Sequence, residues 1–110
     1  MLIHGIQGMT KHNLKAIIYD KRGRILSIGY NNYTKTHPLQ QRLAKKHNLE
    51  HKIYIHAELH AILRCNDITK AHKIFVCRYD YLGNAKLAKP CKMCMDVIQI
   101  VGIKEVEYTE

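Results

Sequence analysis

Hydrophobic and polar residues alternate near the start of the chain in the way typical of paired β-strands. From Leu14 to Asp20, apolar side chains such as Ala16 and Ile18 recur at every second position, which indicates a strand buried on at least one face. A short turn with Gly23 follows, because glycine readily adopts the positive φ angle that such turns need. Arg24–Tyr30 then returns as a second strand, so the pattern predicts a β-hairpin.

Three later segments have the spacing of amphipathic helices. The first spans Pro38 to about Asn48, and proline suits the first helical position. The second spans about His56 to Asp67. The third opens at Pro90 and is closed by Gly102, since glycine often follows the last residue of a helix. The expected buried faces of the second and third helices are Leu59, Ile62 and Leu63, and Met93, Val97, Ile100 and Val101, respectively.

Two further segments, Lys73–Tyr79 and Lys104–Thr109, are predicted strands, the first of them rich in β-branched and aromatic residues. The third helix lies between them, and a strand–helix–strand connection joins parallel strands. The predicted order is therefore strand, strand, helix, helix, strand, helix, strand. It gives an α/β fold with a mixed β-sheet and helices packed on it, in one domain over residues 1–110.

The residues with chemical potential fall at the starts of the second and third predicted helices. His56 opens the segment His-Ala-Glu, and Cys91 and Cys94 belong to the segment Pro-Cys-Lys-Met-Cys. One histidine and two cysteines make three zinc ligands and leave a fourth position open, as in catalytic rather than structural zinc sites. The two cysteines are three positions apart on one helical face, so they can bind the same ion. Glu58 can then move protons without being a ligand.

Other interpretations of the cysteines explain less of the sequence. A Cys-x-x-Cys segment alone can be a redox pair or half of a four-cysteine zinc knuckle. The redox interpretation gives no role to His56 and Glu58. The knuckle needs a second cysteine pair, whereas Cys65 and Cys77 are far apart and flanked by apolar residues. We expect those two to behave as small buried apolar side chains.

The two segments together form the pattern H-x-E…P-C-x-x-C, and in this respect the chain resembles the zinc-dependent cytidine and deoxycytidylate deaminase superfamily. The resemblance implies a cytidine deaminase-like fold in a minimal form, with zinc (Zn2+) as cofactor. It implies an enzyme, a hydrolase that releases ammonia from a nucleobase. His56, Cys91 and Cys94 would be its metal ligands and Glu58 its catalytic proton carrier. The remaining implied contacts are those of the backbone around Ala57 with the base and of Asn31 with the sugar.

The resemblance leaves three functions open. The leading one is deamination of a free cytosine nucleotide such as deoxycytidylate, because residues 98–108 resemble the corresponding helix-to-strand segment of deoxycytidylate deaminases. The alternative is a polynucleotide deaminase, acting on single-stranded DNA or tRNA, because Pro-Cys-Lys-Met-Cys resembles the motif of tRNA adenosine and guanine deaminases. The third is a zinc-binding protein without turnover, which gives no role to Glu58.

The charge balance favours an anionic ligand. Eighteen lysine and arginine residues against nine aspartate and glutamate residues give a formal net charge of +9. A basic surface raises the local concentration of nucleotides or of a polynucleotide backbone, although it also serves solubility. For a 5′-phosphate, Arg78 is the first candidate, since arginine can bind phosphate through two hydrogen bonds, and Lys35 and Lys89 are the other candidates.

The sequence also carries expectations about location and assembly. It has no apolar run long enough to span a membrane and no basic segment followed by an apolar one at its start. Four cysteines, two of them assigned to a metal, favour a reducing compartment, and we expect a cytoplasmic protein. A short sheet with an exposed edge favours a homo-oligomer.

Overall fold

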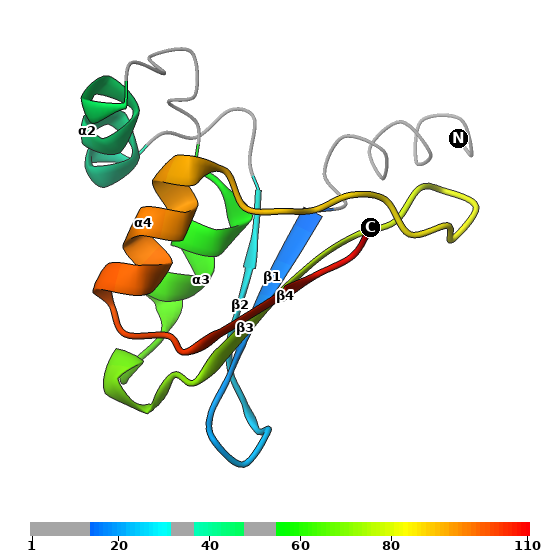
Figure 1. Cartoon of the computed structure of the whole chain (residues 1–110), viewed down its shortest axis with the longest axis horizontal. Helices are drawn as coiled ribbons and strands as arrows, with labels where there is room; N and C mark the ends of the chain where they lie inside the picture. Colours follow the sequence, from blue (N-terminus) through cyan, green and yellow to red (C-terminus); the bar gives the residue numbers. More distant parts are fainter. Residues whose placement is uncertain (1–13, 32–36, 48–54) are drawn as a thin grey trace.

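A four-stranded sheet with helices packed on it forms the part of the chain that the computed structural model describes, residues 14–31, 37–47 and 55–110. The helices α3 and α4 run side by side against the sheet and begin at the same end of it (Figure 1). The described elements are β1 (Leu14–Tyr19), β2 (Ile25–Tyr30), α2 (Pro38–Lys46), α3 (Ala57–Arg64), the 3₁₀ helix η1 (Ile68–Lys70), β3 (Lys73–Arg78), α4 (Lys92–Ile100) and β4 (Glu105–Tyr108).

The sheet is mixed, as predicted. Its strand order is β2-β1-β3-β4, with β1 antiparallel to both neighbours and β3 parallel to β4. The parallel pair is joined through α4, which confirms the predicted crossover. Ile18 pairs with Ser27 on one side and with Ile74 on the other, so β1 lies inside the sheet. Ala16, Ile18, Ile74 and Val76 are fully buried beneath the helices.

The close contact between α3 and β2 depends on the absence of a side chain at Gly29. A Cβ atom there would lie 2.2 Å from the backbone nitrogen of Ala61 and 2.4 Å from the carbonyl oxygen of Ala57. Ser27, two residues earlier on β2, donates a hydrogen bond of 2.7 Å to the carbonyl of Ala61. The small side chains of α3 therefore lie directly on the strand, and this contact sets the position of the first turn of the helix.

The predicted buried faces of α3 and α4 are partly wrong. Leu63 is 42% exposed and Ile100 is 75% exposed, although both were expected inside. Helix α3 is rotated because its small residues Ala57 and Ala61 pack against β2, so that its buried positions include the polar residue Glu58. The buried residues of α3 are Ala57, Glu58, Leu59 and Ala61, and those of α4 are Met93, Cys94, Val97 and Ile98.

The structure differs from the predicted helices at the start of α4 and in having an additional short helix, η1. Pro90 does not open α4, because Cys91 has an extended backbone and is the N-cap of a helix that begins at Lys92. The end of α4 is as predicted: Gly102, with a φ of 87°, follows the C-cap residue. The sequence did not predict η1, which is capped by the carboxylate of Asp67 accepting a hydrogen bond from the backbone of Thr69. The expected end of the first helix at Asn48 falls outside the described residues.

Among the described residues, none of the helices has the length and apolar character needed to cross a membrane.

We expect Gly29→Ala to destabilise the protein severely. The three nearest atoms that the new methyl group would meet all belong to the backbone of Ala57 and Ala61, so none can rotate away, and overpacking of this kind costs about 3 kcal/mol or more. Urea denaturation followed by circular dichroism measures the change. Gly83→Ala is the matched control, because Gly83 has a φ of 86° but no atom within 4 Å of the position that a methyl group would occupy. That control should lose only about 1–2 kcal/mol, and equal losses in the two variants would contradict the steric explanation.

Candidate metal centre

Three side chains from two helix starts converge on one point. His56 is the N-cap residue of α3, Cys91 is the N-cap residue of α4, and Cys94 lies in the first turn of α4. The Nδ1 atom of His56 lies 3.7 Å from Cys91 Sγ and 3.4 Å from Cys94 Sγ. One donor atom from each residue falls within 4.8 Å of the other two. The three residues are therefore positioned to bind a single metal ion.

The spacing of the donor atoms fits zinc. With zinc–nitrogen and zinc–sulfur bonds of ordinary length at tetrahedral angles, nitrogen and sulfur ligands stand about 3.6 Å apart. The two observed nitrogen–sulfur distances, 3.4 and 3.7 Å, lie on either side of that value. The donor chemistry agrees as well, since thiolate and imidazole are the ligands that zinc prefers over carboxylates and water. When bound by three protein ligands, zinc lowers the pKa of a water molecule at its open position.

The environment favours the thiolate form of Cys91. Hydrogen bonding with the Cys94 side chain is the main cause that lowers the pKa of Cys91 to about 3. The imidazole of His56 contributes in the same direction, while burial opposes both. The site also lies at the positive ends of two helix dipoles, which stabilise negative charge. A ligand that is already deprotonated does not have to release a proton when the metal binds.

Glu58 is buried in the helix that follows His56. It lies in the first turn of α3, two residues after His56, and is only 4% exposed. A carboxylate rarely occupies so buried a position unless it is paired or functional. Glu58 is therefore a buried carboxylate in the same helical turn that follows the candidate metal ligand His56.

The structure reveals a supporting residue that the sequence analysis missed. Gln40 of α2 is 1% exposed, and its Oε1 accepts a hydrogen bond of 3.3 Å from the backbone nitrogen of His56. Its Nε2 lies 3.8 Å from the sulfur of Met93 in α4. Gln40 thus links α2 to both helices that carry candidate ligands. The sequence offered one signal for this role. Gln40 lies one helical turn before Ala44 in the predicted helix from Pro38 to about Asn48, and few apolar residues are available there to form a buried face.

A second link holds the end of β2 against α3. His60 Nδ1 accepts a hydrogen bond of 2.9 Å from the backbone nitrogen of Tyr30 and lies 3.1 Å from the carbonyl oxygen of the same residue. His60 is one helical turn after His56, so this contact fixes Asn31, the next residue, beside the helix of the candidate centre. Asn31 is half-buried, and its backbone nitrogen donates to the carbonyl of Leu14 at 3.4 Å.

The other residues predicted to contact the substrate differ in how exposed they are. Ala57 is fully buried, with its carbonyl oxygen facing Gly29 on β2. Arg78 is exposed at the end of β3, where its backbone nitrogen donates a hydrogen bond of 3.0 Å to Thr109. Lys89 is also exposed, and Lys35 lies outside the described residues. Of the remaining cysteines, Cys77 is buried as expected, whereas Cys65 is only half-buried.

Comparison with known proteins agrees with the geometry. Residues 6–110 match the model of the family described as the cytidine and deoxycytidylate deaminase zinc-binding region. No curated protein matches the chain. The family match covers all three converging side chains and the buried Glu58.

Replacing either candidate cysteine ligand should abolish stoichiometric metal binding. We expect the wild-type protein to hold one zinc per chain, and Cys91→Ser and Cys94→Ser each to lose most of it, because serine is a poor zinc ligand. Metal analysis by mass spectrometry after dialysis measures the content. Cys65→Ser is the control, since Cys65 lies outside the cluster, and it should keep its zinc. Full zinc content in both ligand variants would contradict the assignment.

Proposed function

The chain belongs to the cytidine and deoxycytidylate deaminase family and is a zinc-dependent deaminase, and we propose that it converts a cytosine nucleotide, deoxycytidylate or a close analogue, into the uracil product with release of ammonia. The family as a whole acts on nucleotide or nucleic acid substrates. The observation that supports catalysis is the buried Glu58 in the helix that follows His56, a member of the His56, Cys91 and Cys94 cluster.

The proposed reaction exchanges one substituent of the base. Water adds to the ring carbon that bears the exocyclic amine, a proton moves to the adjacent ring nitrogen, and the amine leaves as ammonia. The Glu58 carboxylate takes one proton from the water and delivers it to the ring nitrogen. It then takes the second proton from the hydroxyl group that has been added to the ring carbon and passes it to the departing amine, so that the carbonyl of the uracil product forms. Because Glu58 is buried, this carboxylate is shielded from bulk water that would otherwise exchange its proton.

Three further residues complete the proposed substrate site. Asn31 contacts the sugar, which its attachment to α3 through His60 and Tyr30 supports. The backbone around Ala57 hydrogen-bonds the base, next to the proton carrier Glu58. Arg78 binds the 5′-phosphate. In support, its side chain is exposed and forms no ion pair with another residue in the described part of the chain.

A polynucleotide substrate is the second candidate, and one observation favours it. The loop before Cys91 carries two exposed aromatic side chains, Tyr79 and Tyr81. Exposed aromatic rings near a basic surface can stack on the bases of a single strand. Either substrate requires reduced cysteines at the centre, which supports a cytoplasmic location for the enzyme.

The variant Glu58→Gln should bind zinc and fold but lose nearly all turnover. The amide keeps the size of the side chain and cannot carry the proton, a role that contributes about 10²–10⁴-fold to a rate. Ammonia release from deoxycytidylate measures activity, and metal analysis confirms that zinc is present. Undiminished activity in the zinc-loaded variant would mean that another group carries the proton. A wild-type protein with no activity on any base would instead support zinc binding without turnover.

A cytosine monophosphate should be a better substrate than its nucleoside, and Arg78 should account for the difference. We expect Arg78→Ala to raise KM for deoxycytidylate severalfold and to leave the kinetics with deoxycytidine unchanged, since only phosphate binding is lost. Steady-state assays on a panel of cytosine, adenine and guanine nucleosides, monophosphates and single-stranded oligonucleotides provide the comparison.

The matched control is Arg64→Ala. Arg64 is exposed at the far end of α3 from Glu58, so this variant should behave as wild type with every substrate. An enzyme that ignores all monomers and deaminates only oligonucleotides or tRNA would overturn the proposal in favour of the polynucleotide alternative.

A further inference from the structure

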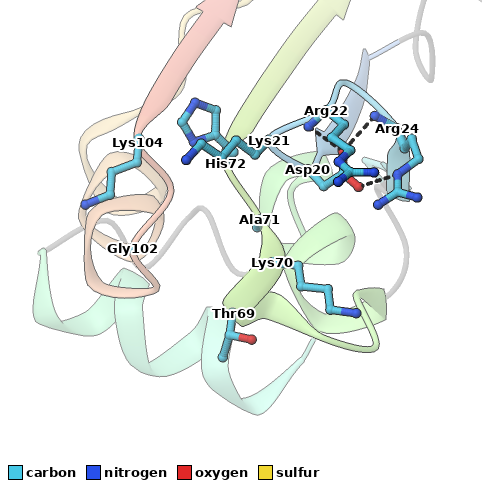
Figure 2. Close-up of a pocket in the computed structure, with 10 residues that line it drawn as sticks. All are labelled: Asp20, Lys21, Arg22, Arg24, Thr69, Lys70, Ala71, His72, Gly102 and Lys104. Atoms are coloured by element: carbon cyan, nitrogen blue, oxygen red, sulfur yellow. Dashed lines mark hydrogen bonds and ion pairs between the residues drawn. The ribbon is translucent and has the colours of Figure 1, made fainter.

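A basic concavity lies at the opposite end of the sheet from the candidate metal centre. Its volume is about 730 Å³, and it opens between the β1–β2 turn on one side and η1 with the α4–β4 connection on the other (Figure 2). The turn contributes Asp20, Lys21, Arg22 and Arg24, and the other side contributes Lys70 and Lys104. We refer to this feature as the hairpin-end concavity.

The length of α4 separates the two sites. The helix begins directly after its N-cap residue Cys91, in the candidate metal centre, and ends beside Gly102, which lines the hairpin-end concavity. Its nine residues correspond to about 14 Å of helix. In Figure 1 the start of α4 lies in the upper half of the view and the β1–β2 turn at the bottom. A ligand in the concavity is therefore distinct from a base held at the metal.

The one carboxylate in the concavity is already engaged. Asp20 accepts hydrogen bonds of 2.9 Å from the backbone nitrogens of both Arg22 and Arg24, and a third of 2.8 Å from Arg24 Nε. The dashed contacts in Figure 2 show this carboxylate holding the turn. His72, which also lines the concavity, lies 2.9 Å from a carboxylate oxygen of Glu105. These two carboxylates, Asp20 and Glu105, thus have partners other than the remaining cations of the concavity.

Four cations are left to act on a ligand. Within the described part of the chain, the side chains of Lys21, Arg22, Lys70 and Lys104 form no ion pair, and all four are exposed. The backbone nearby is satisfied internally: the nitrogen of Lys104 donates to the carbonyl of His72, and the nitrogen of Lys70 donates to that of Asp67. An anionic ligand at this surface would therefore be bound by the cationic side chains and not by these backbone nitrogens.

The exposure of these cations indicates what kind of anion fits. A single ionic contact in water contributes at most about 1 kcal/mol, so one phosphate group would bind weakly here. The buried carboxylate of Asp20 also disfavours a small anion placed deep in the concavity. A chain of phosphates that crosses from the turn to the opposite side adds several contacts at once and releases its counterions. We propose that the hairpin-end concavity binds the phosphodiester backbone of a nucleic acid.

Binding at this surface should be independent of sequence. Tyrosine and phenylalanine are absent from the lining residues, and exposed lysine and arginine side chains suit phosphate oxygens, contacts that position a strand without reading its sequence. The contacts are electrostatic, so the affinity falls steeply with added salt. This second surface binds a polynucleotide whether the base at the metal centre belongs to a free nucleotide or to the same strand.

Fluorescence anisotropy with labelled oligothymidylate tests the proposal, and a labelled duplex in a second series distinguishes single from double strands. Lys70→Gln/Lys104→Gln is compared with Lys45→Gln/Lys46→Gln, whose lysines are exposed on α2. Both double variants lower the formal net charge from +9 by two, to +7. Thymine has no exocyclic amine, so the oligothymidylate is not consumed by deamination.

We expect the concavity pair to weaken binding about tenfold or more and to reduce the slope of log K against log salt by about two, one for each lysine. The α2 pair should bind nearly as the wild type does. Equal losses in both pairs would overturn the proposal, because binding would then follow total charge alone. Inorganic phosphate that competes at the same lysines would also overturn it, since the concavity would then be a small-anion site. Thermal melting of each variant confirms its fold.

Discussion

The contact between α3 and β2 at Gly29 is the constraint on which the rest of the structure depends. Since a side chain at that position would collide with the backbone of Ala57 and Ala61, the helix can lie this close to the strand only over a glycine. The same contact fixes the position of the start of α3 relative to β2, and the start of α3 is where His56 and Glu58 lie. Packing and chemistry are therefore coupled, because the helix that completes the core is also the helix that presents a candidate metal ligand and the proposed proton carrier.

The connection between β3 and β4 places the start of α4 next to the start of α3. The crossover between β3 and β4 sets α4 beside α3, so that Cys91 and Cys94 meet His56 at the shared end of the two helices. Gln40 then ties α2 to both, through the backbone of His56 and the sulfur of Met93. The far end of α4 contributes to the hairpin-end concavity, so one helix connects the metal-binding cluster to a basic surface. The sheet thus carries distinct chemistry at its two ends.

The sequence predicted the sheet, its parallel crossover and the metal-binding cluster, because each leaves a local pattern: alternation in β1, glycine after α4, and two short motifs at helix starts. It did not predict the rotation of α3, since the burial of Glu58 in place of Leu63 follows from contact with Gly29 and not from apolar spacing. The role of Gln40 was also missed, because Gln40 acts through a backbone group that is distant in sequence. Contacts of this kind exist only once the chain is folded.

The central claim is that His56, Cys91 and Cys94 hold a zinc ion with one position open for chemistry. X-ray absorption at the zinc edge of the metal-loaded protein tests it most directly, since sulfur and nitrogen ligands differ in bond length. The account predicts two sulfur ligands at about 2.3 Å and two lighter ligands, nitrogen and oxygen, at about 2.0–2.1 Å. A shell of four sulfur atoms, which would require Cys65 and Cys77 to join the site, or a shell without sulfur would contradict it.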